Sequence, residues 1–304
     1  MLLARSDEVV GVDNLNDYYD VRLKEYRLDR LRRNRGLEFC QLDIENKAAL
    51  AKVFADHRFD AVINLAARAG VRASITSPRV YLTTNTLGTL NLLELMVEHG
   101  VGQFVMASTS SLYAGAKMPF LETADVTHPI SPYAATKLAA EALAQTWHHL
   151  HGINVAILRY FTVYGPAGRP DMGPFRFIEW IRRGQPIQLY GDGNQTRDFT
   201  YIDDIAAGTL AALKVKGAEV INLGGGNEPL SVNAMIAAFE EALGKRAIVE
   251  RLPSNNADMQ DTSAEIGKAR ELLGWSPSIL PADGFEKTAG WHQKHGVQLD
   301  LIQL

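Results

Sequence analysis

The sequence predicts an α/β protein built on a doubly wound parallel sheet, with a smaller α/β region toward the C-terminus. Short runs of β-branched residues alternate with helical stretches through the first half, which is the pattern of strand–helix–strand units. These strands are apolar on both faces, as expected for a sheet that helices cover on both sides. Glycine and proline crowd the segment from Gly165 to Pro174, which predicts a loop that leads into the second region.

The elements are expected in a regular order along the chain. Strands are predicted at Glu8–Val12, Leu37–Leu42, Ala61–Leu65, Gln103–Ala107 and Asn154–Leu158. The helices between them are predicted at Tyr19–Arg33, Lys47–Asp56, Pro78–His99 and Pro132–His151. Further along, helices are expected near Ile202–Lys214 and Ser231–Leu243, and the strand Val220–Leu223 between them should end sharply at Gly224-Gly225-Gly226.

Composition narrows the class of protein. The 304 residues carry 31 Lys and Arg against 35 Asp and Glu, a net charge of −4. No basic excess favours nucleic acid as a partner, and no polybasic or long apolar segment favours a membrane. Cys40 is the only cysteine, which excludes an intrachain disulfide and agrees with a reducing cytoplasm. We expect a cytoplasmic globular protein, and an enzyme at this length.

The run Val9-Val10-Gly11-Val12-Asp13 is an apolar strand that ends in an acid. In dinucleotide-binding sheets such an Asp accepts hydrogen bonds from the adenosine ribose, about 20 residues after a glycine-rich turn. Its charge would repel a 2′-phosphate, which favours NAD over NADP; the simpler alternative is an Asp in a strand-end turn. Counting back about 20 residues runs past Met1, so we expect a sheet that lacks its first strand and the pyrophosphate-binding turn. Met1–Arg5 would then be the end of the first helix.

Tyr133 and Lys137 are four residues apart near the start of a predicted helix, so their side chains share one face. Ser131 can cap this helix, and Pro132 suits its first turn. A nearby ammonium group favours the phenolate and lowers the pKa of a tyrosine, which makes Tyr133 a candidate general base. Many helices contain this spacing by chance. A preceding strand that ends in Ser108-Thr109-Ser110-Ser111 strengthens the case, because it would deliver hydroxyls to the ligand crevice.

Four further stretches complete the pattern: Leu65-Ala66-Ala67-Arg68-Ala69-Gly70-Val71-Arg72, Arg159-Tyr160-Phe161-Thr162-Val163-Tyr164-Gly165-Pro166, Gly191-Asp192-Gly193 and Arg197-Asp198-Phe199-Thr200-Tyr201-Ile202-Asp203-Asp204. With them the chain resembles the extended short-chain dehydrogenase/reductase family, specifically its NAD-dependent sugar-nucleotide epimerases and above all the UDP-glucuronate 4-epimerases. The resemblance covers essentially the whole chain. It implies a Rossmann-type NAD-binding domain of residues 1–165 with about 200–222, and a substrate domain of residues 166–199 with about 223–304.

The resemblance also implies roles for single residues. Thr109, Tyr133 and Lys137 match the family's catalytic triad. The residues expected to bind NAD are Asp13, Asn14, Asp43, Ile44, Leu65, Ala66, Ala67, Arg68, Asn85, Ala107, Tyr133, Lys137 and Tyr160. The residues expected to bind the UDP-sugar are Ser110, Ser111, Thr162, Arg169 and Arg197. Arg197 would meet the UDP phosphates, and Arg169 would face a sugar carboxylate, as a charged fork should; otherwise Arg169 is a solvated loop arginine.

Two details favour a glucuronate epimerase. Related dehydratases and decarboxylases carry a carboxylate just after the triad threonine, where this chain has Ser110-Ser111. Thr162 stands where galactose epimerases tend to have asparagine. The implied reaction is UDP-glucuronate to UDP-galacturonate through a 4-keto intermediate. The alternatives are a UDP-glucose/UDP-galactose 4-epimerase and, because the glycine-rich turn is missing, an inactive binding protein of the same fold.

Three smaller expectations follow. By analogy with the family, the helices Thr86–His99 and Tyr133–His151 should pair two subunits in a homodimer. No residue spacing predicts a metal site, and Asp203-Asp204 is expected to cap a helix rather than bind a metal. The segment Asn255–Met259 departs from the family pattern and leaves Arg251 as the nearest candidate phosphate-binding arginine.

Overall fold

The strands predicted for the first half all form, with small shifts at their ends. The computed structural model describes residues 1–254 and 259–303. The parallel strands are β1 (Val9–Asp13), β2 (Leu37–Gln41), β3 (Val62–Asn64), β4 (Gln103–Thr109), β5 (Asn154–Tyr160) and β10 (Ala218–Leu223). Within the described residues they form two sheets, β2-β1 and β3-β4-β5-β10, so β1 is not hydrogen-bonded to β3. The predicted doubly wound α/β class is confirmed.

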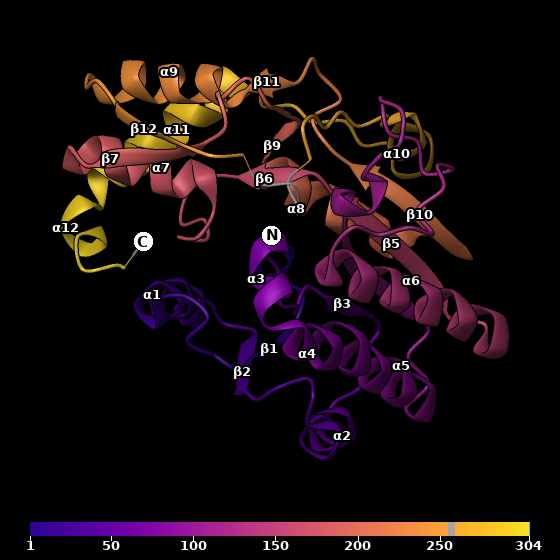
Figure 1. Cartoon of the computed structure of the whole chain (residues 1–304). Helices are drawn as coiled ribbons and strands as arrows, with labels where there is room; N and C mark the ends of the chain where they lie inside the picture. The colour runs from indigo at the N-terminus through magenta and orange to yellow at the C-terminus, as the bar shows by residue number, and fades with distance from the viewer. Residues whose placement is uncertain (255–258, 304) are drawn as a thin grey trace.

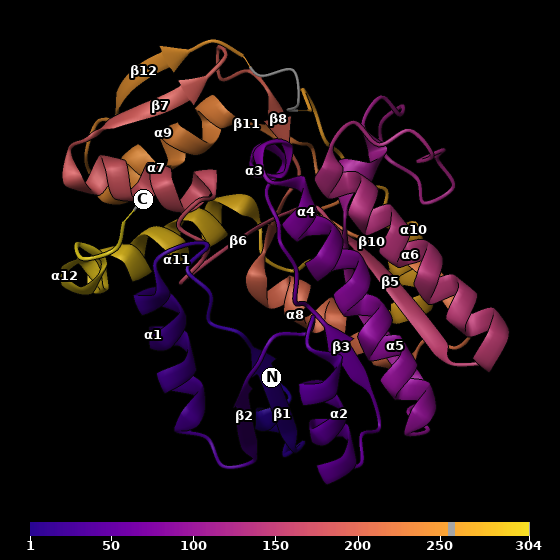
Figure 2. The ribbon, with the colours of Figure 1, turned by 60° about the horizontal axis from the view of Figure 1, so that its bottom comes forward.

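Helices cover both faces of the larger sheet because alternate residues of each strand point to opposite sides. On one face, Phe104 and Met106 of β4 cluster with side chains from α2 (Lys47–Asp56), α5 (Gly88–Glu98) and α6 (Pro132–His151). On the other face, Val105 of β4 clusters with side chains from α8 (Ile202–Ala211), the 3₁₀ turn at Ala212–Lys214 and α10 (Gly267–Leu273). Figures 1 and 2 show α5 and α6 running side by side along this sheet.

The long helix predicted after β3 is divided into three parts. It runs through α4 (Pro78–Tyr81), a π-helical segment at Leu82–Leu87 and α5, and the short helix α3 (Val71–Thr76) precedes it. The π-helical segment carries Asn85, whose side chain is only 1% exposed. A π-turn widens the helix locally and is found most often at functional sites. This segment therefore marks the place where the helix meets the candidate site.

The C-terminal region has a core of its own. It contains α7 (Gly173–Arg183), α9 (Val232–Leu243), α11 (Pro281–Lys294) and the strand pairs β6 (Thr162–Tyr164) with β9 (Phe199–Tyr201), β7 (Pro186–Tyr190) with β12 (Ile248–Leu252), and β8 (Thr196–Arg197) with β11 (Leu230–Ser231). Apolar side chains from these helices and strands make one buried cluster that includes Ile178, Phe239 and Phe285. In Figure 1 this region lies above the part that holds β1, β2 and β3.

The remaining elements are short or lie at the edges. Helix α1 (Val21–Arg32) follows β1, and α12 (Gly296–Leu299) follows α11; η3 (Ser110–Tyr113) extends β4. Met1–Arg5, expected as a helix end, contains a 3₁₀ turn at Leu3–Arg5. Strand β10 ends at Leu223 as predicted, and the amides of Gly225 and Gly226 donate to the buried Asp198 carboxylate. None of the described helices combines the length and apolar character needed to cross a membrane.

Two capping predictions have opposite outcomes. The Ser131 hydroxyl accepts from the Ala134 amide at 3.2 Å, so the predicted cap of α6 is confirmed. The predicted Asp203-Asp204 cap of α8 is wrong, because both residues lie inside the helix and Tyr201 occupies the N-cap position. Asp204 instead accepts from the Ser278 hydroxyl at 2.8 Å and the Ile279 amide at 3.0 Å. A contact between segments far apart in sequence has replaced the local one.

A buried charge cluster joins α7 to the C-terminal segment. Glu179 is fully buried and accepts from Arg182 at 2.8 Å, from Arg183 at 3.0 Å and from the ring of His292 at 2.7 Å. Burial opposes the charged carboxylate, yet the hydrogen bonds from His292 and Arg182 outweigh it and lower its pKa to about 2. Arg182 also pairs with Asp300, so the cluster holds the end of the chain.

Glu179→Gln is expected to lower the free energy of unfolding by about 2–4 kcal/mol at neutral pH, since it removes one partner of a buried charge cluster. A carboxylate whose folded-state pKa is depressed contributes stability that is complete above its unfolded pKa, 4.5. That contribution is lost as the pH falls from there toward about 2. Urea midpoints of both proteins between pH 7 and pH 3 should therefore converge as the solution becomes more acidic. A gap that stays constant with pH would contradict this assignment.

Candidate active site

Tyr133, Lys137 and Thr109 meet where β4 ends and α6 begins. The Ser131 cap and Pro132 at the first turn of α6 fix the start of the helix, which places Tyr133 in that turn. Lys137 follows one turn later on the buried face. Thr109 is the last residue of β4 and hydrogen-bonds with the Tyr133 hydroxyl. The structure thus brings together the three residues expected to form the triad.

Lys137 is buried, and its ammonium group points back at the sheet. Its Nζ donates to the Ala107 carbonyl at 2.9 Å. Burial lowers the pKa of this ammonium group to about 8, and the Glu141 carboxylate one turn further along α6 partly offsets that shift. Ala107, expected to contact NAD, has its carbonyl engaged by Lys137.

The pKa of Tyr133 differs from the expectation. Burial raises it, and the hydrogen bond from Thr109 and the nearby Arg169 guanidinium offset only part of the rise. The predicted net lowering is not seen, because burial outweighs the groups that favour the phenolate. Those groups are the Thr109 hydroxyl and the Arg169 guanidinium.

A buried polar network lies behind the triad. Glu141 accepts from Arg159 at 3.1 and 2.7 Å and from the hydroxyl of Ser108, which neighbours Thr109 on β4. Arg159 also donates to the Tyr113 hydroxyl at 2.9 Å, which in turn donates to Asn222 of β10 at 2.7 Å. Burial raises the pKa of Tyr113 to about 12. This network ties α6 to three strands, so it fixes the position of the helix that carries Tyr133.

Asn85, expected to bind NAD, uses its amide group to hold the chain after β3. Its Oδ1 accepts from the Arg68 amide at 2.8 Å, and its Nδ2 donates to the Arg68 carbonyl at 2.9 Å and to Thr136 of α6 at 3.1 Å. The side chain therefore shapes the segment Leu65–Arg68. The π-helical segment gives Asn85 this reach between β3 and α6.

The residues expected near the adenosine lie together beyond β1 and β2. Asp13 ends β1 with its carboxylate 53% exposed, accepts from the Leu15 amide at 2.7 Å and lies 3.9 Å from the Lys24 ammonium. Asn14 donates to Asp43 at 2.6 Å. Ile44 is buried, in the apolar cluster that α5 shares with the sheet. Asp13 therefore forms a turn at the end of its strand, as the simpler of the two interpretations predicted. Its carboxylate is nevertheless exposed to solvent.

The site has features that fit a dinucleotide. An exposed acid stands at the carboxyl end of β1, and Leu65, a large apolar residue 58% exposed, follows the end of β3. Ala66 continues this edge with its amide bonded to Asn64 at 3.1 Å, and Ala67 lies between it and Arg68. Exposed apolar and acidic groups at the carboxyl edge of a parallel sheet suit an adenosine and its ribose. Lys137 suits a ribose hydroxyl at the other end.

The hydroxyls expected on the substrate side lie just after β4 and at the start of β6. Ser110 and Ser111 begin the turn after Thr109 and are half-buried, and the Ser111 amide donates to Thr109 at 3.1 Å. Thr162 begins β6, with its amide bonded to Asp198. Tyr160, which is expected to bind NAD, lies at the end of β5 and shares a hydrogen bond of 2.7 Å with Thr209 of α8. Burial raises its pKa to about 12.

Arg169 lies near Tyr133, the candidate general base. Its guanidinium pairs with Asp171 and lies 5.7 Å from the centre of the Tyr18 ring. Its side chain is 29% exposed. Its positive charge favours the Tyr133 phenolate. Arg169 is therefore a partly buried cation near Tyr133 rather than an arginine in a fully solvated loop.

The two arginines considered for phosphate binding both donate to main-chain carbonyls. Arg197 lies in β8 and donates to the carbonyls of Thr196 at 2.7 Å and Gln260 at 3.0 Å. Arg251 donates to the carbonyl of Asp192, in the Gly-Asp-Gly turn. Of the segment Asn255–Met259, which departs from the family pattern, residues 255–258 lie outside the described residues.

Tyr18 and Tyr81 are site residues that sequence reasoning missed. Both hydroxyls donate to the Ala69 carbonyl, at 2.7 and 3.0 Å, and the Tyr81 ring meets the Tyr133 ring edge-on with centroids 6.2 Å apart. A Cβ at Gly70 would lie 2.6 Å from the Tyr18 hydroxyl, so a glycine is needed there. The dense Asn, Asp and Tyr run after β1 is the one sequence signal that could have drawn attention to Tyr18.

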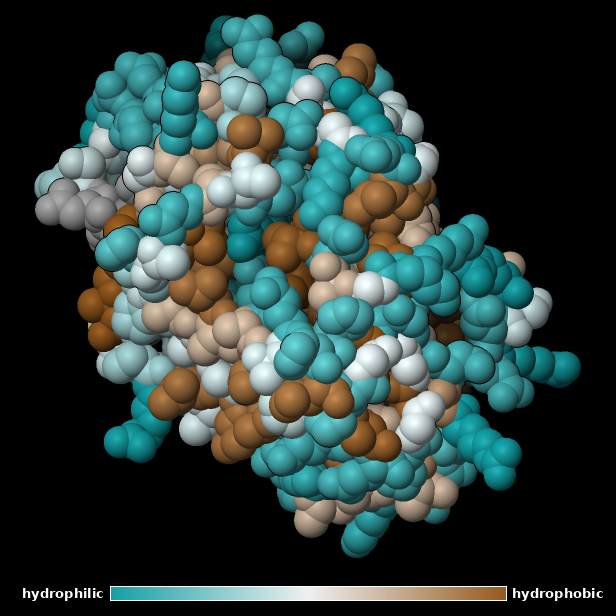
Figure 3. Space-filling view, turned by 90° about the vertical axis from the view of Figure 1, so that its right-hand side faces the viewer, coloured by the Kyte–Doolittle hydropathy of each residue, from teal (hydrophilic) through white to brown (hydrophobic). Residues whose placement is uncertain are grey.

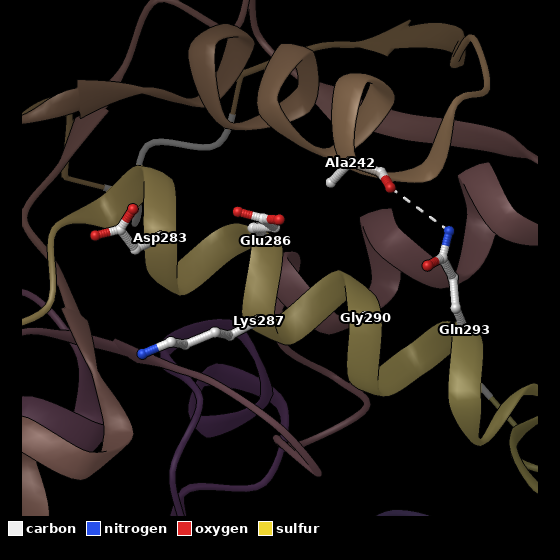
Figure 4. Close-up of a pocket in the computed structure, with 6 residues that line it drawn as sticks. All are labelled: Ala242, Asp283, Glu286, Lys287, Gly290 and Gln293. Atoms are coloured by element: carbon white, nitrogen blue, oxygen red, sulfur yellow. Dashed lines mark hydrogen bonds between the residues drawn. The ribbon is translucent and has the colours of Figure 1, made fainter.

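Two surface hollows are lined by residues other than those predicted for the site. One, between α9 and α11, is lined by Ala242, Asp283, Glu286, Lys287, Gly290 and Gln293 (Figure 4). The other follows Thr76–Val80 and Thr83. Neither includes a residue predicted for the site. Among the described residues, no group of three His, Cys, Asp or Glu side chains is arranged to hold a metal ion.

Known proteins resemble this chain over most of its length. Residues 1–224 match the NAD dependent epimerase/dehydratase family. A UDP-glucuronate 4-epimerase of Thermodesulfobacterium geofontis (strain OPF15) is 53% identical over 302 residues, which are 99% of this chain and 93% of that protein.

Solved structures resemble the whole fold. The UDP-glucuronic acid 4-epimerase of Bacillus cereus, in complex with UDP-glucuronic acid and NAD, is similar with a TM-score of 0.90 and 38% identity, over 96% of this chain and 93% of that one. The UDP-glucose 4-epimerase of Thermotoga maritima, with UDP-glucose, is similar with a TM-score of 0.85 and 30% identity over the same shares.

Proposed function

The chain belongs to the NAD-dependent epimerase/dehydratase family, and on that premise we propose that it interconverts UDP-glucuronate and UDP-galacturonate by inverting C4 of the sugar. The observation that carries the choice of substrate is Arg169 beside Tyr133. A guanidinium at the reacting centre suits a sugar acid, because its fork matches a carboxylate in two parallel hydrogen bonds. The same substrate is named for the 53% identical relative.

The triad supplies the proton chemistry. Tyr133 removes the proton of the sugar 4-hydroxyl and later returns it, while Thr109 hydrogen-bonds the reacting oxygen. Bound NAD supplies the hydride acceptor and donor that takes C4 through a 4-keto sugar. Lys137, held by Ala107, is suited to hold the nicotinamide ribose at a fixed distance from Tyr133. The reaction ends with no net oxidation.

The small hydroxyl residues after Thr109 support epimerisation over related reactions. Elimination and decarboxylation need an additional acid or base near the sugar, and Ser110 and Ser111 provide only neutral hydroxyls. Together with Thr162 they are suited to hydrogen-bond the sugar and its carboxylate. A UDP-glucose substrate would leave the Arg169 charge without a counterpart on the sugar.

We also propose a division of labour between the two regions. Residues 1–165 with about 200–222 would hold NAD, and residues 166–199 with about 223–304 would hold the nucleotide sugar. The apolar cluster under one face of the sheet and the cluster within the C-terminal region are separate, which supports this division. The cluster on the other face of the sheet also includes Ala269 and Trp275 from the second group. Asp13, Asn14, Asp43, Ile44, Leu65, Ala66, Ala67, Arg68, Asn85, Ala107 and Tyr160 belong to the first group, and Arg197 belongs to the second.

The proposal is tested by incubating the purified chain and NAD separately with UDP-glucuronate and UDP-glucose, and separating the products by anion-exchange chromatography. We expect UDP-galacturonate from the first substrate at a rate far above UDP-galactose from the second. Faster turnover of UDP-glucose would favour the neutral-sugar epimerase. Failure to bind NAD by calorimetry would favour a binding protein without catalysis.

We further propose that the protein is a homodimer paired through the helices that follow Thr86 and Tyr133. Large apolar side chains are exposed on or beside these helices, Leu82 at 54%, Leu87 at 44% and Leu150 at 61%. Figure 3 shows apolar surface among hydrophilic side chains on the side of the molecule that carries α5 and α6. Exposed apolar side chains that gather on one face of a protein mark an interaction surface, whereas single scattered ones do not. This supports pairing of two subunits through these helices.

Light scattering is expected to give twice the 33.5 kDa chain mass, and Leu87→Glu with Leu150→Glu should reduce it to one chain mass. Leu280→Glu is the matched control, since Leu280 is 59% exposed but lies outside these helices. A wild-type monomer would refute the dimer. The single free Cys40 and the nucleotide substrates support a cytoplasmic location, which cell fractionation would test.

A further inference from the structure

The loop that carries Arg169 is held by an arginine from the opposite region of the chain. Helix α1 follows β1 and lies beside the C-terminal segment in both Figures 1 and 2. Leu23 of α1 clusters with Phe175, Leu299 and Ile302. From this helix Arg27 reaches the loop between β6 and α7.

Arg27 contacts the loop through main-chain atoms. Its Nε donates to the Ala167 carbonyl at 2.8 Å, and its Nη2 donates to the Gly168 carbonyl at 2.8 Å. Its Nη1 donates to the Tyr19 hydroxyl at 2.6 Å, which fixes the orientation of the guanidinium. All three nitrogens of the planar guanidinium therefore donate a hydrogen bond, two to successive carbonyls and one to a hydroxyl. A lysine ammonium cannot reproduce that geometry.

The loop backbone needs such support. Ala167 has φ of +52°, in the left-handed region that residues with a Cβ adopt at a cost. Strained backbone of this kind persists where its surroundings over-determine it. The two hydrogen bonds from Arg27 fall on this residue and the next one, directly before Arg169.

The same N-terminal segment also touches the Arg169 side chain. The Tyr18 ring lies 5.7 Å from the Arg169 guanidinium, and the Tyr18 hydroxyl is anchored on the Ala69 carbonyl. Thus Arg27 sets the backbone from which Arg169 projects, and Tyr18 limits where its guanidinium can lie.

We propose that Arg27 is a positioning residue that aims Arg169 at the acidic group of the sugar and so sets the preference for a uronic acid over a neutral sugar. The proposal rests on the proposed function, because it needs Arg169 to recognise a carboxylate. It predicts an effect that depends on the charge of the sugar rather than on the nucleotide, which both substrates share.

The test compares dissociation constants of UDP-glucuronate and UDP-glucose for the NAD-loaded full chain by calorimetry. Arg27→Ala is expected to reduce the preference for UDP-glucuronate by on the order of tenfold while UDP-glucose binding stays within about twofold. The preference of Arg27→Lys for UDP-glucuronate should lie between those of the wild type and Arg27→Ala, since a lysine can reach one of the two carbonyls but not both. Arg30→Ala is the matched control one turn along the same helix, where the side chain is exposed and donates to Tyr26.

A double-mutant cycle separates positioning from general damage. If Arg27 acts through Arg169, then Arg27→Ala should leave the preference unchanged in an Arg169→Ala background. An equal loss for both sugars, or an undiminished effect without Arg169, would overturn the proposal while leaving the epimerase function intact. A wild-type chain with no preference for UDP-glucuronate would overturn both.

Discussion

Replacing Tyr133 by phenylalanine is expected to lower kcat for UDP-glucuronate by about 10²–10⁴-fold, the usual contribution of a positioned acid–base group. The ring remains, so its edge-on contact with Tyr81 survives, and only the hydroxyl bonded to Thr109 is lost. Binding of NAD and of the nucleotide sugar should change little. Turnover is followed by chromatographic separation of the two uronic acid nucleotides, and binding is followed by calorimetry.

Tyr26→Phe makes the same chemical change on α1, where the hydroxyl contacts Arg30 and not the triad. It should leave kcat unchanged. Near wild-type turnover by Tyr133→Phe would remove Tyr133 from the role of base and would point to another proton acceptor at the end of β4.

Replacing Arg169 by alanine should produce the second largest effect. Loss of a charge-assisted, two-pronged hydrogen bond costs about 3 kcal/mol, which corresponds to about 10²-fold in kcat/KM for UDP-glucuronate. Part of the loss should appear in kcat, because the guanidinium also favours the Tyr133 phenolate. The affinity for UDP-glucose should change by less than about threefold, a small fraction of the loss with the acidic sugar.

Arg169→Lys keeps the charge without the fork, so it should recover kcat more than KM. Asp171→Asn offers a further check, since Asp171 accepts from Arg169 and would compete with a substrate carboxylate. Equal losses of kcat/KM with the acidic and the neutral sugar would show that Arg169 stabilises the loop and does not recognise the sugar carboxylate.

The sequence predicted the sheet well because its short strands are apolar on both faces and are separated by helices with clear starts. Helices Lys47–Asp56 and Pro132–His151 have the predicted bounds, the second because Ser131 and Pro132 mark its first turn. The C-terminal strands β6, β7, β8, β9, β11 and β12 were missed because each has only two to five residues, and among them only β9 is buried throughout. Helix α7 was missed since Gly173 and Pro174 were assigned to the loop, although proline in a first turn favours a helix start.

The triad could be predicted because its spacing is local and its preceding strand delivers Thr109 to the same edge. Contacts that depend on tertiary packing could not. No feature of the neighbouring sequence indicates that Asn85 bonds to both the amide and the carbonyl of Arg68. Equally, none indicates that Arg27 reaches a loop 140 residues away. For Asp204 a local sequence rule predicted a helix cap. The structure instead pairs its carboxylate with Ser278 and Ile279, which lie far away in the sequence.

Cys40 offers a practical handle on these ideas. As the one cysteine of the chain it would take a single spin or fluorescent label, placed on β2 beside the strand that ends in Asp13. Burial and the neighbouring Glu38 raise the pKa of its thiol, so labelling should be slow at neutral pH and faster in mildly alkaline buffer. In a homodimer, two such labels would report the distance between the two nucleotide-binding regions without any engineered residue.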